Sequence, residues 1–189
     1  MKIRPLHSWD IPRENAAALQ NDLRTQLVLA DPEPEDRITC IAGADISYDR
    51  HSDLFFAVAV LLSYPGLMVR EEARAIGRAS FPYIPGFLSF REGPILLEAL
   101  AELRTIPDAV MFDGHGIAHP RGFGLASHLG LWLDLPSIGC AKSRLVGDYR
   151  EPGPEAGEEE PLLYKERIIG LVLRTKRRVR PVFISPGHR

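Results

Sequence analysis

Residues 37–62 read RITCIAGADISYDRHSDLFFAVAVLL, and this stretch decides the fold. Its first part, residues 37–47, is rich in β-branched and apolar side chains, and residues 54–62 form a continuous apolar run. A short apolar run of this kind is typical of a central strand that is covered on both faces. Because only a short polar turn at 49–53 separates the two segments, we expect them to pair as antiparallel neighbours.

The segments on either side extend this pair into a mixed sheet. Residues 67–81 predict a third strand at the edge, and apolar residues at helical spacing over 13–30 predict a helix packed on the body. Later helices and strands are expected to alternate, at 94–103, 109–112, 122–133, 137–141, 168–173 and 179–184. Three antiparallel strands followed by parallel strands predict an α/β fold with helices on both faces of the sheet.

Length and composition indicate one globular domain over residues 1–189. The hydrophobic fraction of 45% and the charged fraction of 25% are ordinary for such a domain. No apolar run reaches the roughly 18 residues that span a bilayer, and no signal peptide is visible. Cys40 and Cys140 form no metal-binding spacing and predict thiols inside apolar strands in a reducing compartment. We therefore expect a cytoplasmic protein with no membrane partner.

Charge is unevenly distributed although the net charge is only −2. Five glutamates fall within residues 151–160, a segment that predicts a surface loop, whereas basic residues crowd 174–180. Two interpretations of the basic stretch fit: its side chains neutralise phosphates, or they form the solvated end of a strand. The candidate phosphate contacts are Arg174, Lys176 and Arg177.

Three carboxylates stand where strands or helices meet glycine-rich segments. Asp45 lies inside an apolar strand, where aspartate is disfavoured and a buried carboxylate needs a partner. Asp113 ends the strand at 109–112, and Glu92 is expected to open a helix, where the helix dipole favours negative charge. Mg²⁺ prefers oxygen ligands, so these residues are compatible with metal-dependent phosphodiester hydrolysis. Scattered structural acids are the alternative.

Two loops complete the candidate site. In the first, Pro82-Tyr83-Ile84-Pro85, the prolines stiffen a tip that either parts bases in a duplex or packs on the core. The second, residues 113–124, is rich in glycine, which lets backbone amides approach a flipped base. Lys142 follows a predicted strand and is a candidate phosphate ligand. The intervening Gly116 argues against a helical zinc site at His115 and His119.

Together these segments resemble the endonuclease V family, also called deoxyinosine 3′ endonucleases, over about residues 10–189. The motifs that carry the resemblance are GADIS at 43–47, PYIPG at 82–86, FRE at 90–92, DGHG at 113–116, HPR at 119–121, IGCAK at 138–142 and SPGHR at 185–189.

The resemblance implies a ribonuclease H-like fold and Mg²⁺ as cofactor, with Mn²⁺ able to replace it. It implies hydrolysis of the second phosphodiester bond 3′ to hypoxanthine in DNA. By motif position it makes Asp45, Glu92 and Asp113 the metal ligands and adds Lys142 and His188 as catalytic residues. It assigns the strand-separating wedge to Pro82, Tyr83, Ile84 and Pro85, and the base pocket to Gly86, Leu88, Gly114, His119 and Gly124.

Several expectations remain open at this point. His188 is next to the last residue, where chain ends fray. Inosine-containing RNA, or branched or flapped DNA, is an alternative substrate, since no residue decides on the 2′-hydroxyl. A binding module that no longer cuts would need a broken metal site, whereas all three carboxylates are present. We expect a monomer that acts on DNA containing deaminated purines.

Overall fold

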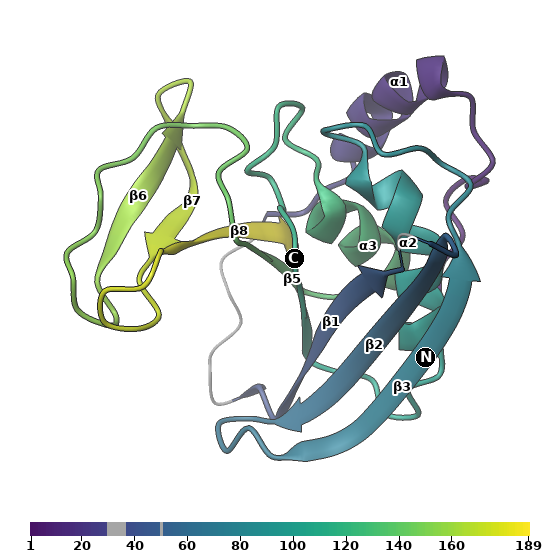
Figure 1. Cartoon of the computed structure of the whole chain (residues 1–189), viewed down its shortest axis with the longest axis horizontal. Helices are drawn as coiled ribbons and strands as arrows, with labels where there is room; N and C mark the ends of the chain where they lie inside the picture. Colours follow the sequence, from purple (N-terminus) through teal and green to yellow (C-terminus); the bar gives the residue numbers. More distant parts are fainter. Residues whose placement is uncertain (30–36, 50) are drawn as a thin grey trace.

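A computed structural model describes residues 1–29, 37–49 and 51–189, and these form one eight-stranded mixed sheet with three helices (Figure 1). The strand order is β3-β2-β1-β4-β5-β8-β7-β6. The elements, in chain order, are α1 Arg13–Arg24, β1 Cys40–Tyr48, β2 Leu54–Ser63, β3 Val69–Arg78, α2 Leu88–Ala101, β4 Ala109–Phe112, α3 Leu125–Leu133, β5 Ser137–Ala141, β6 Glu159–Tyr164, β7 Arg167–Leu173 and β8 Val182–His188.

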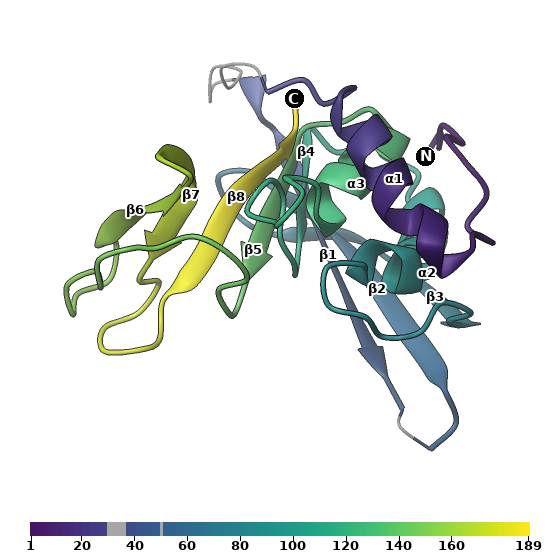
Figure 2. The same cartoon turned by 90° about the horizontal axis from the view of Figure 1, so that it is seen from above.

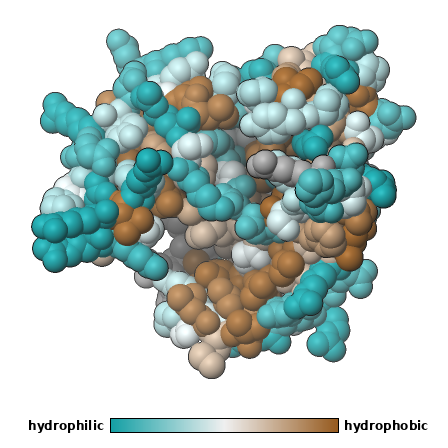
Figure 3. Space-filling model, in the orientation of Figure 1, coloured by the Kyte–Doolittle hydropathy of each residue, from teal (hydrophilic) through white to brown (hydrophobic). Residues whose placement is uncertain are grey.

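The antiparallel meander β1–β2–β3 confirms the expectation for the first three strands. Its burial alternates along the chain: in β2, Phe55, Ala57 and Ala59 are buried, whereas Phe56 between them is exposed. The expectation of a strand covered on both faces is therefore wrong within the described residues. Figure 3 shows hydrophobic side chains gathered over the lower part of the molecule, where Figure 1 places these strands.

The helices all lie on the buried side of the sheet, within the part of the chain that the structure describes. Helix α2 packs on β1, β2 and β3, α3 packs on β4, β5 and β8, and the two helices contact each other. Helix α1 stacks on α3 as an outer layer, which Figure 2 shows from above. The expected placement of helices on both faces is thus corrected to one face.

The second half of the sheet contains fewer parallel strands than expected. Within the described residues, only the β1–β4 and β4–β5 pairs are parallel, whereas β8 is antiparallel to β5, and β7 and β6 follow as an antiparallel hairpin. Strand β6 begins at Glu159, inside the segment predicted to be a loop. Its exposed residues are Glu159, Pro161 and Leu163. The glutamates and the proline at its start suit an edge strand and hide the usual apolar signal.

Two helices differ from their predicted bounds. Helix α1 ends at Arg24, well before the predicted end at residue 30, which lies outside the described residues. Helix α2 begins at Leu88 and has Pro94 in its interior. Its first turn buries Ser89 and Phe90, and this packing outweighs the backbone hydrogen bond that a proline removes. As a result, Glu92 lies one turn inside the helix.

Two further observations concern the chain as a whole. Both cysteines are free thiols; Cys40 is buried and Cys140 is half-buried. In the described part of the chain, no helix has the length and the apolar composition that a membrane span requires.

The absence of a side chain at Gly139 in β5 lets the backbone of the glycine-rich loop pack directly against the sheet. A Cβ atom there would lie 2.7 Å from the carbonyl carbon of His115 and would also collide with backbone atoms of Gly114 and Gly116. We expect Gly139→Ala to lower the free energy of unfolding by about 3 kcal/mol, because backbone cannot move aside as a side chain can. Gly43→Ala in β1 is the matched control, since a Cβ there meets nothing within 4 Å. Urea denaturation measures both; equal stability of the two variants would contradict this packing.

Candidate active site and base pocket

Asp45 and Asp113 are brought together by strand pairing. β1 and β4 run parallel with Ala44 opposite Phe112, and each aspartate is the next residue. The amide of Asp113 donates to the carbonyl of Ala44, 3.3 Å away. Both carboxylates therefore follow the last pair of this parallel ladder and lie side by side, Asp113 at the end of β4 and Asp45 within β1.

Glu92, in α2, lies near this pair of aspartates, and their charges affect its pKa. Burial raises the pKa of Glu92 to about 7, and the negative charges of Asp45 and Asp113 add to the effect, against a smaller opposing influence of Arg91. The expectation that Glu92 opens a helix is wrong, so the helix dipole is not what favours its position. Glu92 is therefore close enough to both aspartates for their charges to disfavour its ionisation.

The aspartates are more accessible than expected. Asp45 is exposed, and its Oδ1 accepts a hydrogen bond of 2.7 Å from the amide of Ile46, so the argument from a buried carboxylate does not hold. Lys142 follows β5 and its Nζ donates to Oδ2 of Asp113. That hydrogen bond and the charge of Asp113 raise the pKa of Lys142. As the side chains stand, no three His, Cys, Asp or Glu residues among those described form a group that could hold a metal ion.

A cavity of about 180 Å³ is lined in part by His115, which is two residues from Asp113 and within reach of its charge. This volume is below the roughly 300 Å³ at which pockets for drug-sized ligands begin, so it suits one small planar group. Its walls comprise Gln20, residues 83–86, Leu88, Ser89, His115, His119, Gly124, Leu125 and residues 143–145. Four of the five residues predicted for the base pocket are therefore in the wall. The fifth, Gly114, does not line the cavity. It packs against Leu125, which does, and a Cβ at Gly114 would meet the Leu125 side chain.

The Tyr83 tip is anchored through the carbonyl of Gly86. This oxygen accepts hydrogen bonds from Arg121 Nη2 at 2.7 Å, His119 Nε2 at 2.9 Å and Gln20 Nε2 at 3.1 Å. Gly86 has a φ of +82°, which directs its carbonyl toward these donors and favours glycine. Tyr83 itself remains 70% exposed at the rim of the cavity. The backbone of the tip is thus anchored at Gly86, whereas the aromatic ring of Tyr83 is exposed.

His119 is neutral in this arrangement. Burial lowers its pKa to about 4, with the charge of Arg121 adding to the effect. Its Nδ1 accepts from the amide of Arg121, which leaves the proton on Nε2 for the carbonyl of Gly86. Both ring nitrogens are therefore used within the protein, and His119 positions the two loops relative to each other.

Several wall residues were missed by the sequence analysis. Gln20 is 1% exposed and joins α1 to both loops through Gly86, Phe123 and Arg121. His115 has a buried Nδ1 with no hydrogen-bond partner among the described residues, and burial lowers its pKa. Residues 143–145 reach the wall because they continue from β5. His115 was visible in the DGHG motif, whereas no local pattern marks Gln20.

His188 does not lie at the carboxylates. It pairs with Ser137 at the start of β5, whereas Lys142 follows the end of that strand, five residues and about 16 Å further along at 3.3 Å per residue. His188 is 3% exposed, and its Nδ1 accepts from the amide of Val28 at 3.2 Å. Both expectations are therefore corrected: His188 is neither frayed nor placed to act in catalysis.

The three basic candidates divide into one structural residue and two surface residues. Arg174 is 7% exposed, and its guanidinium donates to the carbonyls of Pro152, Gly153 and Val179 and to Glu151. Its assignment as a phosphate contact is corrected, because all its donors are directed into the protein. Lys176 and Arg177 are exposed, and Arg177 pairs with Glu155 at 3.0 Å.

Arg174 should matter for stability rather than for nucleic acid. We expect Arg174→Gln to lower the free energy of unfolding by about 2–4 kcal/mol, because three carbonyls lose a buried donor. Lys176→Gln, an equal loss of charge on the exposed part of the same loop, is expected to change stability by less than about 0.5 kcal/mol. Thermal unfolding of both variants checks this. Weaker DNA binding by a fully stable Arg174→Gln protein would show the assignment to be wrong.

The mixed sheet, with Asp45 in β1 and Asp113 at the end of the neighbouring strand β4, is typical of the ribonuclease H-like class of folds. A model of the family described as endonuclease V matches residues 21–189. The chain therefore belongs to the endonuclease V family.

Relatives agree in sequence and in structure. Endonuclease V of Dehalococcoides mccartyi is 46% identical over 189 residues, covering 100% of this chain and 84% of the relative. The crystal structure of endonuclease V from Streptomyces avermitilis is 43% identical, with a TM-score of 0.89 over 100% of this chain and 83% of that chain. Ciona intestinalis endonuclease V, in complex with a 24mer DNA containing an inosine followed by a ribo-adenosine, is 26% identical, with a TM-score of 0.78 over 90% of this chain and 81% of that chain.

Proposed function

We propose that this protein is a Mg²⁺-dependent DNA repair endonuclease that recognises deoxyinosine and hydrolyses the second phosphodiester bond 3′ to it. One observation carries the proposal: a carboxylate group and a cavity for one base adjoin in a single site, joined by residues 142–145. The DNA bound to the Ciona relative contains an inosine, which supports the same lesion here. Because one chain supplies the whole site, we expect the protein to act as a monomer. We also expect it to act in the cytoplasm.

The carboxylates fit a hard divalent cation. Asp45, Glu92 and Asp113 offer only oxygen ligands, and the charges of the two aspartates disfavour ionisation of Glu92, an effect that a bound cation would offset. Mg²⁺ usually takes one or two carboxylates and keeps waters and phosphate oxygens, so small side-chain rotations would suffice. When bound, it would supply an activated water and stabilise the leaving oxygen, and Mn²⁺ would serve in its place.

The remaining residues bind and orient the nucleic acid. Tyr83 enters the base stack from its anchored tip, and the displaced base occupies the cavity beside His115. Neutral His119 holds the two loops that form the cavity. Lys142, whose ammonium already lies at Asp113, contacts the phosphate that approaches the carboxylates.

RNA is the second candidate substrate, and one observation favours it. The DNA in the Ciona complex carries a ribonucleotide directly after the inosine, so that protein accommodates a 2′-hydroxyl near the lesion. Competition between labelled deoxyinosine DNA and inosine RNA for this protein distinguishes the two. Preferential cleavage of RNA would replace the DNA repair assignment and leave the site unchanged.

A nicking assay tests the proposal as a whole. We expect multiple turnovers on a duplex with a single deoxyinosine in the presence of Mg²⁺, and none on the matched duplex with deoxyadenosine. Binding to the deoxyinosine duplex without any nicking would instead identify a protein that only marks the lesion.

Glu92 should make metal binding depend on pH. Its pKa of about 7 means that a proton competes with the metal below neutrality. The apparent affinity for Mg²⁺ is expected to rise by about tenfold per pH unit up to about pH 7, and then to level off, as one proton is displaced. Calorimetry in buffers of different ionisation enthalpy counts that proton. Glu92→Gln is expected to remove this dependence; an unchanged slope in the variant would assign the proton to another group.

A further inference from the structure

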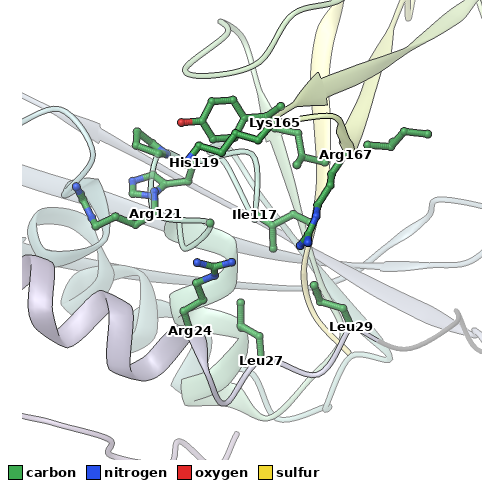
Figure 4. A pocket seen from close by; sticks show the side chains of 13 residues that line it. Arg24, Leu27, Leu29, Ile117, His119, Arg121, Lys165 and Arg167 are labelled. Atoms are coloured by element: carbon green, nitrogen blue, oxygen red, sulfur yellow. The ribbon is translucent and has the colours of Figure 1, made fainter.

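A groove of about 630 Å³ lies between the end of α1 and the tip of the β6–β7 hairpin, and we call it the hairpin groove. It is much larger than the base cavity of about 180 Å³. Its apolar surface includes Ile117 from the glycine-rich loop (Figure 4). Ile168 from β7 also lines it. None of the functions derived above uses this groove.

The charged side chains that line the hairpin groove are all positive. Arg24, Lys165 and Arg167 line it, and no carboxylate does so among the described residues. None of these three cations forms an ion pair with a described carboxylate, and all three are exposed. Figure 4 places Arg24 on the α1 side and Arg167 on the hairpin side. A concave, unpaired cationic surface attracts a chain of phosphates.

The local backbone holds these cations at the groove. Lys165 and Glu166 form the hairpin turn, and both have positive φ values, 51° and 62°, which give a tight turn. The turn places Lys165 over the ring of Tyr164, 5.2 Å from its centroid, so an aromatic face lies beside the charges. Arg24 lies over Gly122, where a Cβ would come within 3.1 Å of its Nε. Aromatic rings among cations are typical of surfaces that follow a single strand.

The hairpin groove is adjacent to the base cavity. His119 lines both, so the two spaces are separated by this one side chain and its loop. The cavity is also lined by His115 and Ser143, which follow Asp113 and Lys142 closely in the chain, and neither of these two residues lines the hairpin groove. We therefore expect a strand whose base occupies the cavity and whose 3′ phosphates reach the carboxylates to pass His119 on its 5′ side.

We propose that the hairpin groove binds the sugar-phosphate backbone of the lesion strand on the 5′ side of the flipped base, with Arg24, Lys165 and Arg167 as phosphate ligands and Tyr164 as a stacking surface. This assignment rests on the proposed function, because the polarity of the strand follows from cutting 3′ to the lesion. The β6–β7 hairpin would thus contact the damaged strand on the 5′ side of the flipped base, whereas the strand is cut on the 3′ side.

The test measures binding of labelled deoxyinosine duplexes in EDTA by fluorescence anisotropy. The variant is Lys165→Gln/Arg167→Gln, and the matched control is Arg70→Gln/Arg74→Gln on β3, the opposite edge of the sheet. On a duplex with a long 5′ flank the hairpin variant is expected to bind about tenfold more weakly. Its salt slope should be shallower by about 0.7 to 0.9 for each lost phosphate contact. The control variant is expected to bind as the wild type does.

A second duplex, whose lesion strand begins at the deoxyinosine, separates the outcomes. On it the hairpin variant and the wild type should bind equally. Equal loss of affinity on both duplexes, no loss on either, or a loss that follows truncation of the complementary strand would overturn the groove assignment. Failure of the wild type to nick the deoxyinosine duplex would instead refute the proposed function.

Discussion

Replacing Asp113 with asparagine is expected to lower kcat for nicking a deoxyinosine duplex by about 10³-fold or more, in a protein that stays folded. Asp113 combines a position at the carboxyl end of β4 with contact to Lys142 and proximity to Glu92. Loss of its charge would remove a proposed metal ligand, and bound metal would supply several kcal/mol of stabilisation of the transition state, with each 1.36 kcal/mol about a factor of ten. Single-turnover nicking at saturating Mg²⁺ measures the effect.

The matched control is Asp108→Asn, the same change at a structural carboxylate. Oδ2 of Asp108 accepts from the amides of Thr39 and Cys40 at 2.8 and 3.0 Å, so this variant should lose about 1 kcal/mol of stability. It should retain nicking, because Asp108 precedes β4 and lies at the other end of that strand. Full activity of Asp113→Asn would remove the carboxylate group from the mechanism.

Tyr83→Ala is expected to slow nicking of a deoxyinosine duplex by about 10- to 100-fold at subsaturating substrate. Parting a base step costs a few kcal/mol, and an inserted ring offsets part of that cost. Stability should not change, because the Tyr83 side chain is 70% exposed while its loop is anchored through Gly86. The single-stranded deoxyinosine substrate needs no opening and should be cut within about twofold of the wild-type rate.

Met68→Ala provides the control for removing a large exposed side chain. Met68 is also 70% exposed, and it lies in the turn between β2 and β3. This variant should nick duplex and single strand as the wild type does. An equal loss for Tyr83→Ala on both substrates would assign the ring to base binding rather than to strand separation.

The sequence predicted those parts of the site that follow from neighbouring strands. An apolar run that ends in aspartate appears in the chain itself, and parallel pairing of β1 with β4 then places Asp45 beside Asp113. The stiff loop and the glycine-rich loop were also visible, because proline and glycine mark such loops locally. These features needed no knowledge of distant contacts.

Features that depend on long-range packing were not predictable in the same way. Arg174 belongs to a basic cluster in sequence, and only the folded loop shows that carbonyls surround it. His188 matched a motif, yet antiparallel pairing of β8 with β5 places it at the wrong end of the strand. The early start of α2 depends on burial of Phe90, which outweighs the local effect of Pro94.

The most direct measurement of the central claim maps the cut position on a duplex with one deoxyinosine. With Mg²⁺ present, a sequencing gel should show a single nick at the second phosphodiester bond 3′ to the lesion, with 3′-hydroxyl and 5′-phosphate ends. Without the metal, no product should form. A cut at another position, or equal cutting of an undamaged duplex, would contradict the account in which the cavity beside Tyr83 selects the base and the carboxylates cut on its 3′ side.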